Sequence, residues 1–308
     1  MENVRLNITN EFAKLETVII GIANSCGPAP SADECYDPKS RQHVEAGTYP
    51  IESDLISEID NLANELSNRG IQVIRPDLID NYNQIFSRDI GFVINDKFII
   101  SQMIEERSKE IEAIEDFVDQ FPSEDVIKMG GEVFLEGGDI ILYDQDIFIG
   151  YANEEEFMNL KVARTNAAGV DFIKKHFPEK TVHSFQLNKS DGNPKENALH
   201  LDCCFQPLGL GHCLIHEEGF KHLADLETLY SIFGKENCIT INAQEMYDMG
   251  ANVFSIAPDT IVSEKGFTRI NAELKSRGYE VIEVPYAETA KMEGLLRCST
   301  LPIQRSKT

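Results

Sequence analysis

The chain has 308 residues, of which 42% are hydrophobic, and a formal net charge of −24 from 52 acidic and 28 basic residues. A length of this order allows one large domain or two modest ones. Proteins that bind the nucleic-acid backbone depend on Lys and Arg to displace counterions, so this charge excludes that class. The charge also disfavours an anionic membrane surface, and no run approaches the roughly 18 apolar residues of a membrane-spanning helix.

The cysteines and the N-terminus indicate a cytoplasmic protein. The seven cysteines are odd in number and scattered, and a chain of this size does not need disulfides for stability. We therefore expect reduced thiols. The first residues, MENVRLNITNEF, carry no apolar segment of the kind found in secretory signals.

One structural unit recurs along the chain. The apolar, β-branched run at residues 16–23 predicts a buried strand. A segment with apolar residues at helical spacing then ends at Gly70 and leads into a predicted strand at 69–77. The order helix, Arg-Gly and x-x-Val-Ile returns with a helix at 268–277 and a strand at 277–285, which indicates duplication of one unit.

The segments between these two ends fit a module of two strands, a helix and a strand. The predicted strand pairs are 90–103, 139–152, 202–216 and 251–264, and the helices that follow them are expected near 105–120, 166–176, 222–233 and 268–277. With the N-terminal unit there are five modules. One module has too little apolar surface to be stable alone, so the five must pack around a common axis.

This organisation predicts an α/β fold, a five-bladed α/β propeller of ββαβ modules around a central channel, as one catalytic domain over 1–308. Residues that open the strands would converge on the channel. A doubly wound sheet is the alternative, but no Gly-rich phosphate loop follows any strand. The irregular stretch at 24–48 is long for a packed domain, which is typical of a lid or a disordered loop.

Four short segments that open or follow predicted strands carry the residues that could do chemistry. They are FSRDIGFVI with Asp89, LEGGDIIL with Glu136 and Asp139, HLDCCFQPLG with His200, Asp202 and Cys204, and EGLLRCSTLPIQR with Cys298. If the third segment is a strand, His200, Asp202 and Cys204 share one face. That would bring a base and an anion together, which is rarer than an isolated structural histidine.

Each segment also has a structural interpretation. Asp89 beside Arg88 is typical of a turn or a surface pair, and EGGD of a tight turn. The glycines of EGGD would also let the backbone approach a ligand closely. A free cysteine such as Cys298 is usually a small buried hydrophobe.

A zinc site is a competing interpretation of the third segment. Its candidate ligands are His200, Cys203, Cys204, His212, Cys213 and His216. Zinc ligands normally come in spaced pairs, whereas two adjacent cysteines on a strand point to opposite faces. We therefore expect no metal.

In combination the motifs resemble the guanidino-group-modifying superfamily of arginine deiminases, dimethylarginine dimethylaminohydrolases and amidinotransferases. SRD, EGGD, H-x-D and a late Cys occur in the order of that family, and the resemblance runs from NEFAKLETVIIG (10–21) through RTNAAG (164–169) to RCSTLPI (297–303). It implies a five-bladed α/β propeller, the pentein fold, with no cofactor. It also implies that Cys298 is the nucleophile, that His200 is the general acid and base, and that Glu136 orients His200.

The resemblance further implies which side chains bind substrate. The guanidinium would be held by Asp89 and Asp202, the α-carboxylate of the substrate by Arg164 and Arg107, and the pocket would be lined by Asn252 and Asp139.

These residue types suit attack on a guanidinium carbon, which is a poor electrophile because its charge is delocalised. A thiol is a strong nucleophile, and His200 as imidazolium could protonate the departing nitrogen and then activate water. The acids Asp89, Glu136 and Asp202 should raise the pKa of Cys298 above the usual value of about 8.5 in the empty protein. A bound guanidinium would cancel that field, so we hypothesise that the substrate activates its own nucleophile.

The sequence thus predicts a metal-independent hydrolase of C–N bonds in a small guanidino substrate, arginine or a close derivative, that releases ammonia and citrulline through a thiouronium intermediate. An amidinotransferase is the alternative at the same site: ETVIIG favours it, whereas EGGD and RTN favour a hydrolase. A non-catalytic binding protein for cationic amino acids is an alternative of another class, which the complete Cys298–His200–Glu136 set disfavours. The chain is compatible with a homo-oligomer.

Overall fold

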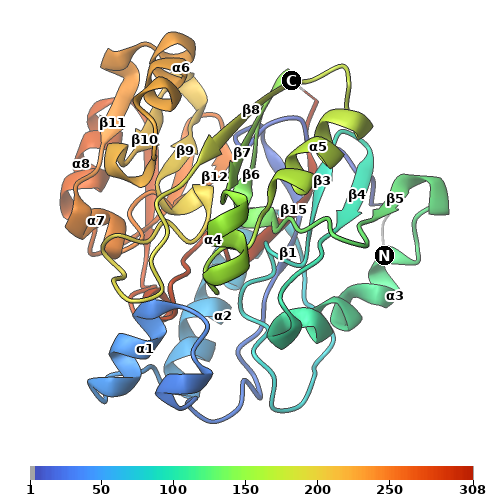
Figure 1. The fold of residues 1–308 in the computed structure, drawn as a ribbon, viewed down its shortest axis with the longest axis vertical. Helices are drawn as coiled ribbons and strands as arrows, with labels where there is room; N and C mark the ends of the chain where they lie inside the picture. Colours follow the sequence, from blue (N-terminus) through green and yellow to red (C-terminus); the bar gives the residue numbers. More distant parts are fainter. Residues whose placement is uncertain (1–3, 308) are drawn as a thin grey trace.

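Five three-stranded sheets make up the fold in the structure, a computed structural model that describes residues 4–307 (Figure 1). In every sheet the middle strand pairs antiparallel with one neighbour and parallel with the other. A hairpin followed by a helical crossover produces this arrangement. The predicted five-module α/β propeller is therefore confirmed, and the doubly wound sheet is wrong because the strands form five separate sheets.

The four internal sheets lie close to the predicted strand pairs. They consist of β3 (Gly91–Ile94), β4 (Lys97–Ile100) and β5 (Val126–Lys128); β6 (Ile140–Tyr143), β7 (Asp146–Tyr151) and β8 (Thr181–Gln186); β9 (Phe205–Pro207), β10 (Cys213–Ile215) and β11 (Cys238–Thr240); and β12 (Phe254–Ala257), β13 (Thr260–Glu264) and β14 (Glu280–Val284). Three of their crossover helices are α5 (Ala167–His176), α6 (Leu223–Phe233) and α8 (Thr268–Ser276); two short helices, α4 (Glu154–Asn159) and α7 (Ala243–Tyr247), lie in connecting segments.

The fifth sheet joins the two ends of the chain. Its middle strand β1 (Leu15–Ile20) pairs parallel with β2 (Gln72–Ile74) after helix α2 (Glu52–Asn68), and antiparallel with β15 (Thr300–Arg305). The two strands β1 and β15 lie side by side near the middle of the molecule (Figure 1). The sequence predicts only one strand before the helix in this unit, and the last strand of the chain supplies the missing one.

Helix α2 shows how the modules bury their helices. Its apolar side chains recur at helical spacing, so they form one face, and these residues are all buried in one cluster: Leu55, Ile59, Leu62, Ala63 and Leu66. A glutamate on the same helix, Glu58, is also buried, because its carboxylate accepts hydrogen bonds from the backbone amides of Glu288 and Thr289. The helix is thereby fixed against the segment that leads to β15.

Two predicted segments differ from the structure. The stretch 24–48 is not wholly irregular: it contains a short 3₁₀ turn at Ala32–Glu34 and helix α1 (Pro38–Glu45), which Asp37 caps by accepting from the amide of Ser40. The segment predicted as a helix near 105–120 is a 3₁₀ helix over Glu105–Ile114 followed by the short helix α3 (Glu115–Val118). Residues three apart eclipse one another in a 3₁₀ helix, which suits an ion pair at that spacing.

The propeller brings the openings of its inner strands together. Asp89 lies two residues before β3, Gly138 two before β6, Asp202 three before β9, Asn252 two before β12 and Cys298 two before β15. These positions are equivalent in the five modules, so residues far apart in the sequence meet at the axis. None of the helices formed by residues 4–307 is long and apolar enough to cross a membrane.

Candidate active site

The Cys298 thiol is buried and held by side chains of two other modules. Its sulfur lies 3.2 Å from the Asn252 Nδ2 atom and 3.7 Å from the Asp202 Oδ2 atom. Asn252 also accepts a hydrogen bond from the backbone amide of Cys298 at 3.1 Å. The side-chain amide of Asn252 thus fixes both the backbone and the sulfur of Cys298. That Asn252 lines a substrate pocket stays a prediction.

His200 lies between two carboxylates. Its Nε2 atom forms a 2.8 Å hydrogen bond with Glu136 Oε2, and its Nδ1 atom lies 3.8 Å from Asp89 Oδ1. All three residues are buried. The Glu136 contact has the geometry of a carboxylate that orients a catalytic imidazole.

Gly138 makes this packing possible. A Cβ atom at Gly138 would lie 2.6 Å from His200 Nδ1 and 3.0 Å from Asp89 Oδ1. The Gly138 amide also donates to Asp89 Oδ1 at 3.1 Å. The EGGD glycines are therefore a close-approach element, and the approaching groups are the imidazole and the carboxylate.

The predicted strand geometry of the third segment is wrong. His200 is followed by a 3₁₀ turn over Leu201–Cys203, and β9 begins only at Phe205, so His200, Asp202 and Cys204 do not alternate along a strand. Cys204 instead packs in a separate core cluster. The turn has a physical support that the sequence does not reveal: Asp139 Oδ1 accepts from the Leu201 amide at 2.8 Å.

The three remaining predicted binding residues, Asp139, Arg107 and Arg164, have different partners. Asp139 supports the backbone between His200 and Asp202. Arg107 forks onto Glu110 at 2.7 and 2.9 Å and also binds Asp89 at 2.7 Å.

Arg164 has more capacity for an external ligand. It donates hydrogen bonds to the carbonyls of Lys161 and Tyr36 at 2.9 and 3.0 Å. Its contact with the Glu136 carboxylate is longer, at 3.5 Å. A substrate carboxylate would compete with weaker contacts at Arg164 than at Arg107, whose guanidinium is already matched by Glu110 and Asp89.

Burial and the neighbouring charges set the protonation of the two reactive groups. Burial, with Asp202 and Asp89, raises the pKa of Cys298 well above its usual range, as expected for the empty protein. Burial lowers the pKa of His200, but Asp89 and Glu136 outweigh it and raise that pKa to about 8. For the Glu136 carboxyl, burial raises the pKa, but the charges of Arg164 and His200 outweigh burial and lower that pKa to about 2. The empty site therefore holds a thiol, an imidazolium and an ionised Glu136 at neutral pH.

Asp89, Glu136 and His200 each offer a ligand atom within 4.8 Å of the others, and they are the one such group of His, Cys, Asp and Glu in the part of the chain that the structure describes. The charges of Asp89 and Glu136 are already balanced by Arg107 and Arg164. The arrangement therefore suits a planar cation that forms hydrogen bonds to the remaining lone pairs of these carboxylates.

The zinc alternative does not assemble. The Nδ1 atom of His212 contacts the Tyr279 hydroxyl, that of His216 contacts the Ile241 carbonyl, and Cys213 lies against Cys238.

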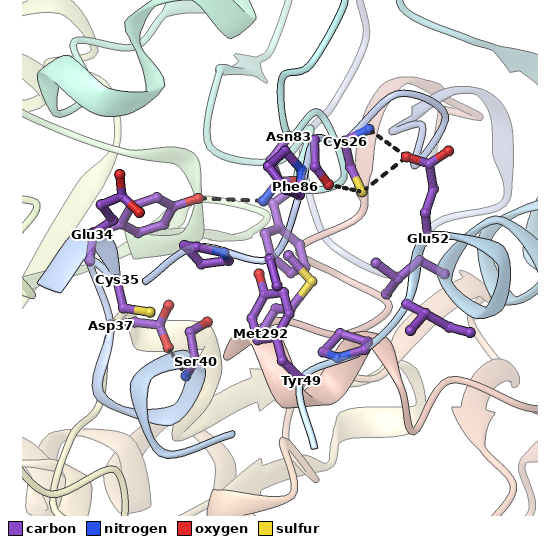
Figure 2. A pocket seen from close by; sticks show the side chains of 18 residues that line it. Cys26, Glu34, Cys35, Asp37, Ser40, Tyr49, Glu52, Asn83, Phe86 and Met292 are labelled. Atoms are coloured by element: carbon purple, nitrogen blue, oxygen red, sulfur yellow. Dashed lines mark hydrogen bonds between the residues drawn. The ribbon is translucent and has the colours of Figure 1, made fainter. Parts of the chain in front are cut away.

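A cavity of about 400 Å³ lies beneath the loop that precedes α2, and Asp37, Ser40, Phe86 and Met292 are among its lining residues (Figure 2). The predicted site residues are not among those that line it. Cys298, His200 and Glu136 are themselves buried. Arg164 connects the loop that lines the cavity to Glu136, because it also donates to the Tyr36 carbonyl. The prediction that 24–48 acts as a lid remains a prediction.

Sequence reasoning missed three charged residues of the site. Glu110 pairs with Arg107, and Arg297 binds both Glu11 and Asp202. The signals were present: Glu110 is three residues after Arg107, and Arg297 directly precedes Cys298. Glu11 lies in the NEF segment, where no local pattern points to the site.

The profile described as N,N dimethylarginine dimethylhydrolase, eukaryotic, matches residues 35–305. The chain belongs to this family. The N,N dimethylarginine dimethylhydrolase family is part of the guanidino-group-modifying superfamily, so the resemblance found in the motifs is confirmed. The superfamily consists of enzymes that act on guanidino groups.

The individual proteins that the chain resembles share only 18 to 27% of its residues in the alignments described next. The chain is 27% identical over 301 residues to the uncharacterized protein YkgA of Bacillus subtilis (strain 168), covering 96% of this chain and 94% of that one. It is 25% identical over 289 residues to the arginine deiminase of Oenococcus oeni, covering 80% and 67%. The solved structure of SxtG, an amidinotransferase from Microseira wollei in the saxitoxin biosynthetic pathway, matches with a TM-score of 0.77 at 18% identity over 98% of both chains. That likeness shows the fold.

Gly138→Ala should displace the imidazole of His200, because the new methyl group would overlap its Nδ1 atom. We expect guanidino-modifying activity to fall by about 100-fold, the order of loss produced by misplacing a reactive group by about 1 Å. Gly130→Ala is the matched control, since a Cβ there meets nothing within 4 Å. Turnover assays and thermal unfolding of both variants test this, and full activity of Gly138→Ala would contradict it.

His200 should titrate near pH 8, and Glu136→Gln should move that titration to lower pH, because Glu136 is one of the anions that raise the pKa. Since the folded pKa exceeds the usual 6.5, proton binding stabilises the fold below pH 6.5, and this stabilisation is lost as the pH rises through about 8. NMR titration of the imidazole, assigned with His200→Gln, measures both midpoints. An unchanged midpoint in Glu136→Gln would argue against this contact.

Proposed function

We propose that the chain is a cysteine-dependent hydrolase of a C–N bond in a guanidino substrate, arginine or a close derivative such as N,N-dimethylarginine. The observation that carries the proposal is the Glu136–His200 hydrogen bond of 2.8 Å in the same buried site as a thiol 3.7 Å from Asp202. A nucleophile, a positioned acid and anions for a flat cation are the groups that this chemistry needs.

The first half of the reaction forms a bond between sulfur and the guanidinium carbon. The Cys298 thiol releases its proton to solvent water as the substrate cation neutralises the surrounding carboxylates, and the thiolate adds to the carbon. The C–N bond then breaks, and the departing nitrogen takes a proton from the His200 imidazolium and leaves as ammonia or an amine. The enzyme retains the rest of the substrate as a thiouronium.

The second half restores the enzyme. Neutral His200 takes a proton from water, the hydroxide adds to the thiouronium carbon, and the S–C bond breaks to give a ureido product and the free cysteine. Glu136 keeps the imidazole in the orientation required for both transfers.

The size of the electrostatic term supports activation by the substrate. Asp202 and Asp89 disfavour the thiolate in the empty site, and a unit positive charge about 4 Å away is worth roughly 4 kcal/mol at an effective dielectric of 20. That energy corresponds to about three pKa units. Binding of a cation therefore moves the Cys298 equilibrium toward the thiolate by up to about three pKa units.

The contacts of the arginines favour Arg164 as the group that binds a substrate carboxylate, with Tyr36 beside it. Asp89, Asp202 and Asn252 border the reacting carbon, while Asp139 acts by supporting the turn after His200. Arg107 holds Asp89 in place.

Cys298→Ala should abolish turnover and retain substrate binding, because the carboxylates that attract the cation remain. Release of ammonia and citrulline from arginine, and of dimethylamine from N,N-dimethylarginine, measures the loss; calorimetry measures the binding. Cys238→Ala, which removes a thiol in β11, is the control and should turn over normally. Retained product release by Cys298→Ala would refute the nucleophile, and binding without turnover in the unmodified chain would favour the non-catalytic binding protein.

Incubation with arginine in the presence of glycine or lysine should still yield citrulline and ammonia, because the proposed second nucleophile is water. Appearance of ornithine with an amidinated amine would instead identify an amidinotransferase.

Exhaustive chelation should leave the rate unchanged, since thiol, imidazole and carboxylates supply every step proposed. Loss of the rate on chelation and its recovery with zinc would contradict this and point to a metal at Asp89, Glu136 and His200.

A further inference from the structure

Arg297 is a fully buried guanidinium that lies between two carboxylates. Its Nη1 atom donates to Asp202 Oδ2 at 2.8 Å, while its Nε and Nη2 atoms donate to the two carboxylate oxygens of Glu11 at 3.3 and 3.0 Å. Its Nη2 atom also donates to the Ile140 carbonyl at 2.6 Å. One cation is thus shared by two anions, and only Asp202 contacts the Cys298 sulfur.

Glu11 is held in place by backbone contacts that do not involve the thiol. The N-terminal segment is fixed by a bridge between Asn10 and Tyr143, and the amide of Glu11 donates to the Leu142 carbonyl. The Leu142 amide in turn donates to Glu11 Oε1. These bonds anchor the segment to β6, so replacing the Glu11 carboxylate by the neutral amide of Gln should leave the segment in place.

The arrangement makes the environment of Cys298 depend on how Arg297 is compensated. Asp202 lies 3.7 Å from the sulfur, and its negative charge opposes a thiolate there. Arg297 offsets this charge, but Glu11 offsets Arg297 from the other side. Removing Glu11 should therefore strengthen the effect of Arg297 on the thiol, and removing Arg297 should leave Asp202 uncompensated.

A purely structural role gives a different expectation. If Arg297 served only to connect the N-terminal segment with β6, loss of either partner would loosen the same connection. Both changes would then affect the thiol in the same direction. Opposite directions are the signature of charge sharing.

We propose that Arg297 is a positioning residue that divides its charge between Glu11 and Asp202 and thereby sets how readily Cys298 forms its thiolate. The role rests on the proposed function only in that Cys298 is taken as the nucleophile. Glu11, which touches neither the sulfur nor Asp202 in any contact described above, acts on the nucleophile through Arg297.

The test measures alkylation of Cys298 by iodoacetamide as a function of pH, followed by mass spectrometry of the peptide that contains Cys298. The thiolate is the reacting form, so the rate at a fixed pH below the pKa changes by about tenfold for each pKa unit. At pH 8 we expect Glu11→Gln to react about three- to tenfold faster than the unmodified protein and Arg297→Met about three- to tenfold slower. Arg297→Lys keeps the charge and should restore most of the rate.

Arg277→Met is the control for loss of an arginine that forms an ion pair away from the site. Arg277 pairs with Glu273 at 2.7 Å and donates to the carbonyl of Glu236. Its removal should lower the thermal stability and leave the pH dependence of alkylation unchanged. An effect as large as that of Arg297→Met would assign the change to general loosening and overturn the proposal.

Glu11→Gln decides the question even if Arg297→Met does not fold. An unchanged or slower alkylation rate in Glu11→Gln overturns the charge-sharing role, as does equal behaviour of Arg297→Met and Arg297→Lys. The proposed function fails by a separate result, which is product release by Cys298→Ala. The two readouts are independent because alkylation reports on the thiol whether or not the substrate is turned over.

Discussion

The pairing of β1 with β15 is the interaction on which the active site depends. It pairs two strands from opposite ends of the chain: Ile20 lies opposite Thr300, 280 residues later in the sequence. This pairing closes the ring of five sheets. Without this pairing Cys298 would have no fixed relation to His200 or Asp202. The geometry around Cys298 is therefore a consequence of closure, because Cys298, the proposed nucleophile, lies two residues before the strand that completes the ring.

The closed ring concentrates charges of both signs in a volume from which water is excluded. Each carboxylate near the thiol already has a cation from the protein: Arg107 for Asp89, Arg164 and His200 for Glu136, and Arg297 for Asp202. Uncompensated carboxylates would be too costly to bury. A carboxylate can accept several hydrogen bonds, so the proposed guanidino substrate would join these pairs by sharing oxygen atoms that the arginines leave available. In that proposal, a network that guanidinium groups already stabilise would bind one more guanidinium.

The sequence predicts the parts of this molecule that depend on local pattern. Apolar periodicity identifies the modules, and the repeated Arg-Gly signal reveals their duplication. The order of motifs identifies Cys298, His200 and Glu136 as a set, and the structure contains the Glu136–His200 contact. Where the sequence fails, a distant group decides the local geometry: Asp139 holds the turn after His200, so the expected strand does not begin until Phe205.

The partners of the buried charges could not be read from the sequence for the same reason. Nothing near Glu11 indicates that it meets Arg297, because 286 residues separate them and only ring closure brings them together. The antiparallel partner of β1 could not be predicted either, because this strand, β15, lies at the other end of the chain. Such long-range pairings have no local signature, whereas Glu110, three residues from Arg107, could have been found from its spacing alone.

The position of Cys298, two residues before the final strand β15, also bears on when the site can first assemble during synthesis. Four sheets are complete once translation has passed Val284, yet the remaining sheet still lacks its inner strand and the central pocket lacks its sulfur. Strand β1 can complete its sheet only after β15 has been synthesised, so this sheet is the last of the five that can form. A nascent chain halted before Cys298 would carry the imidazole and the acids but no means of attack.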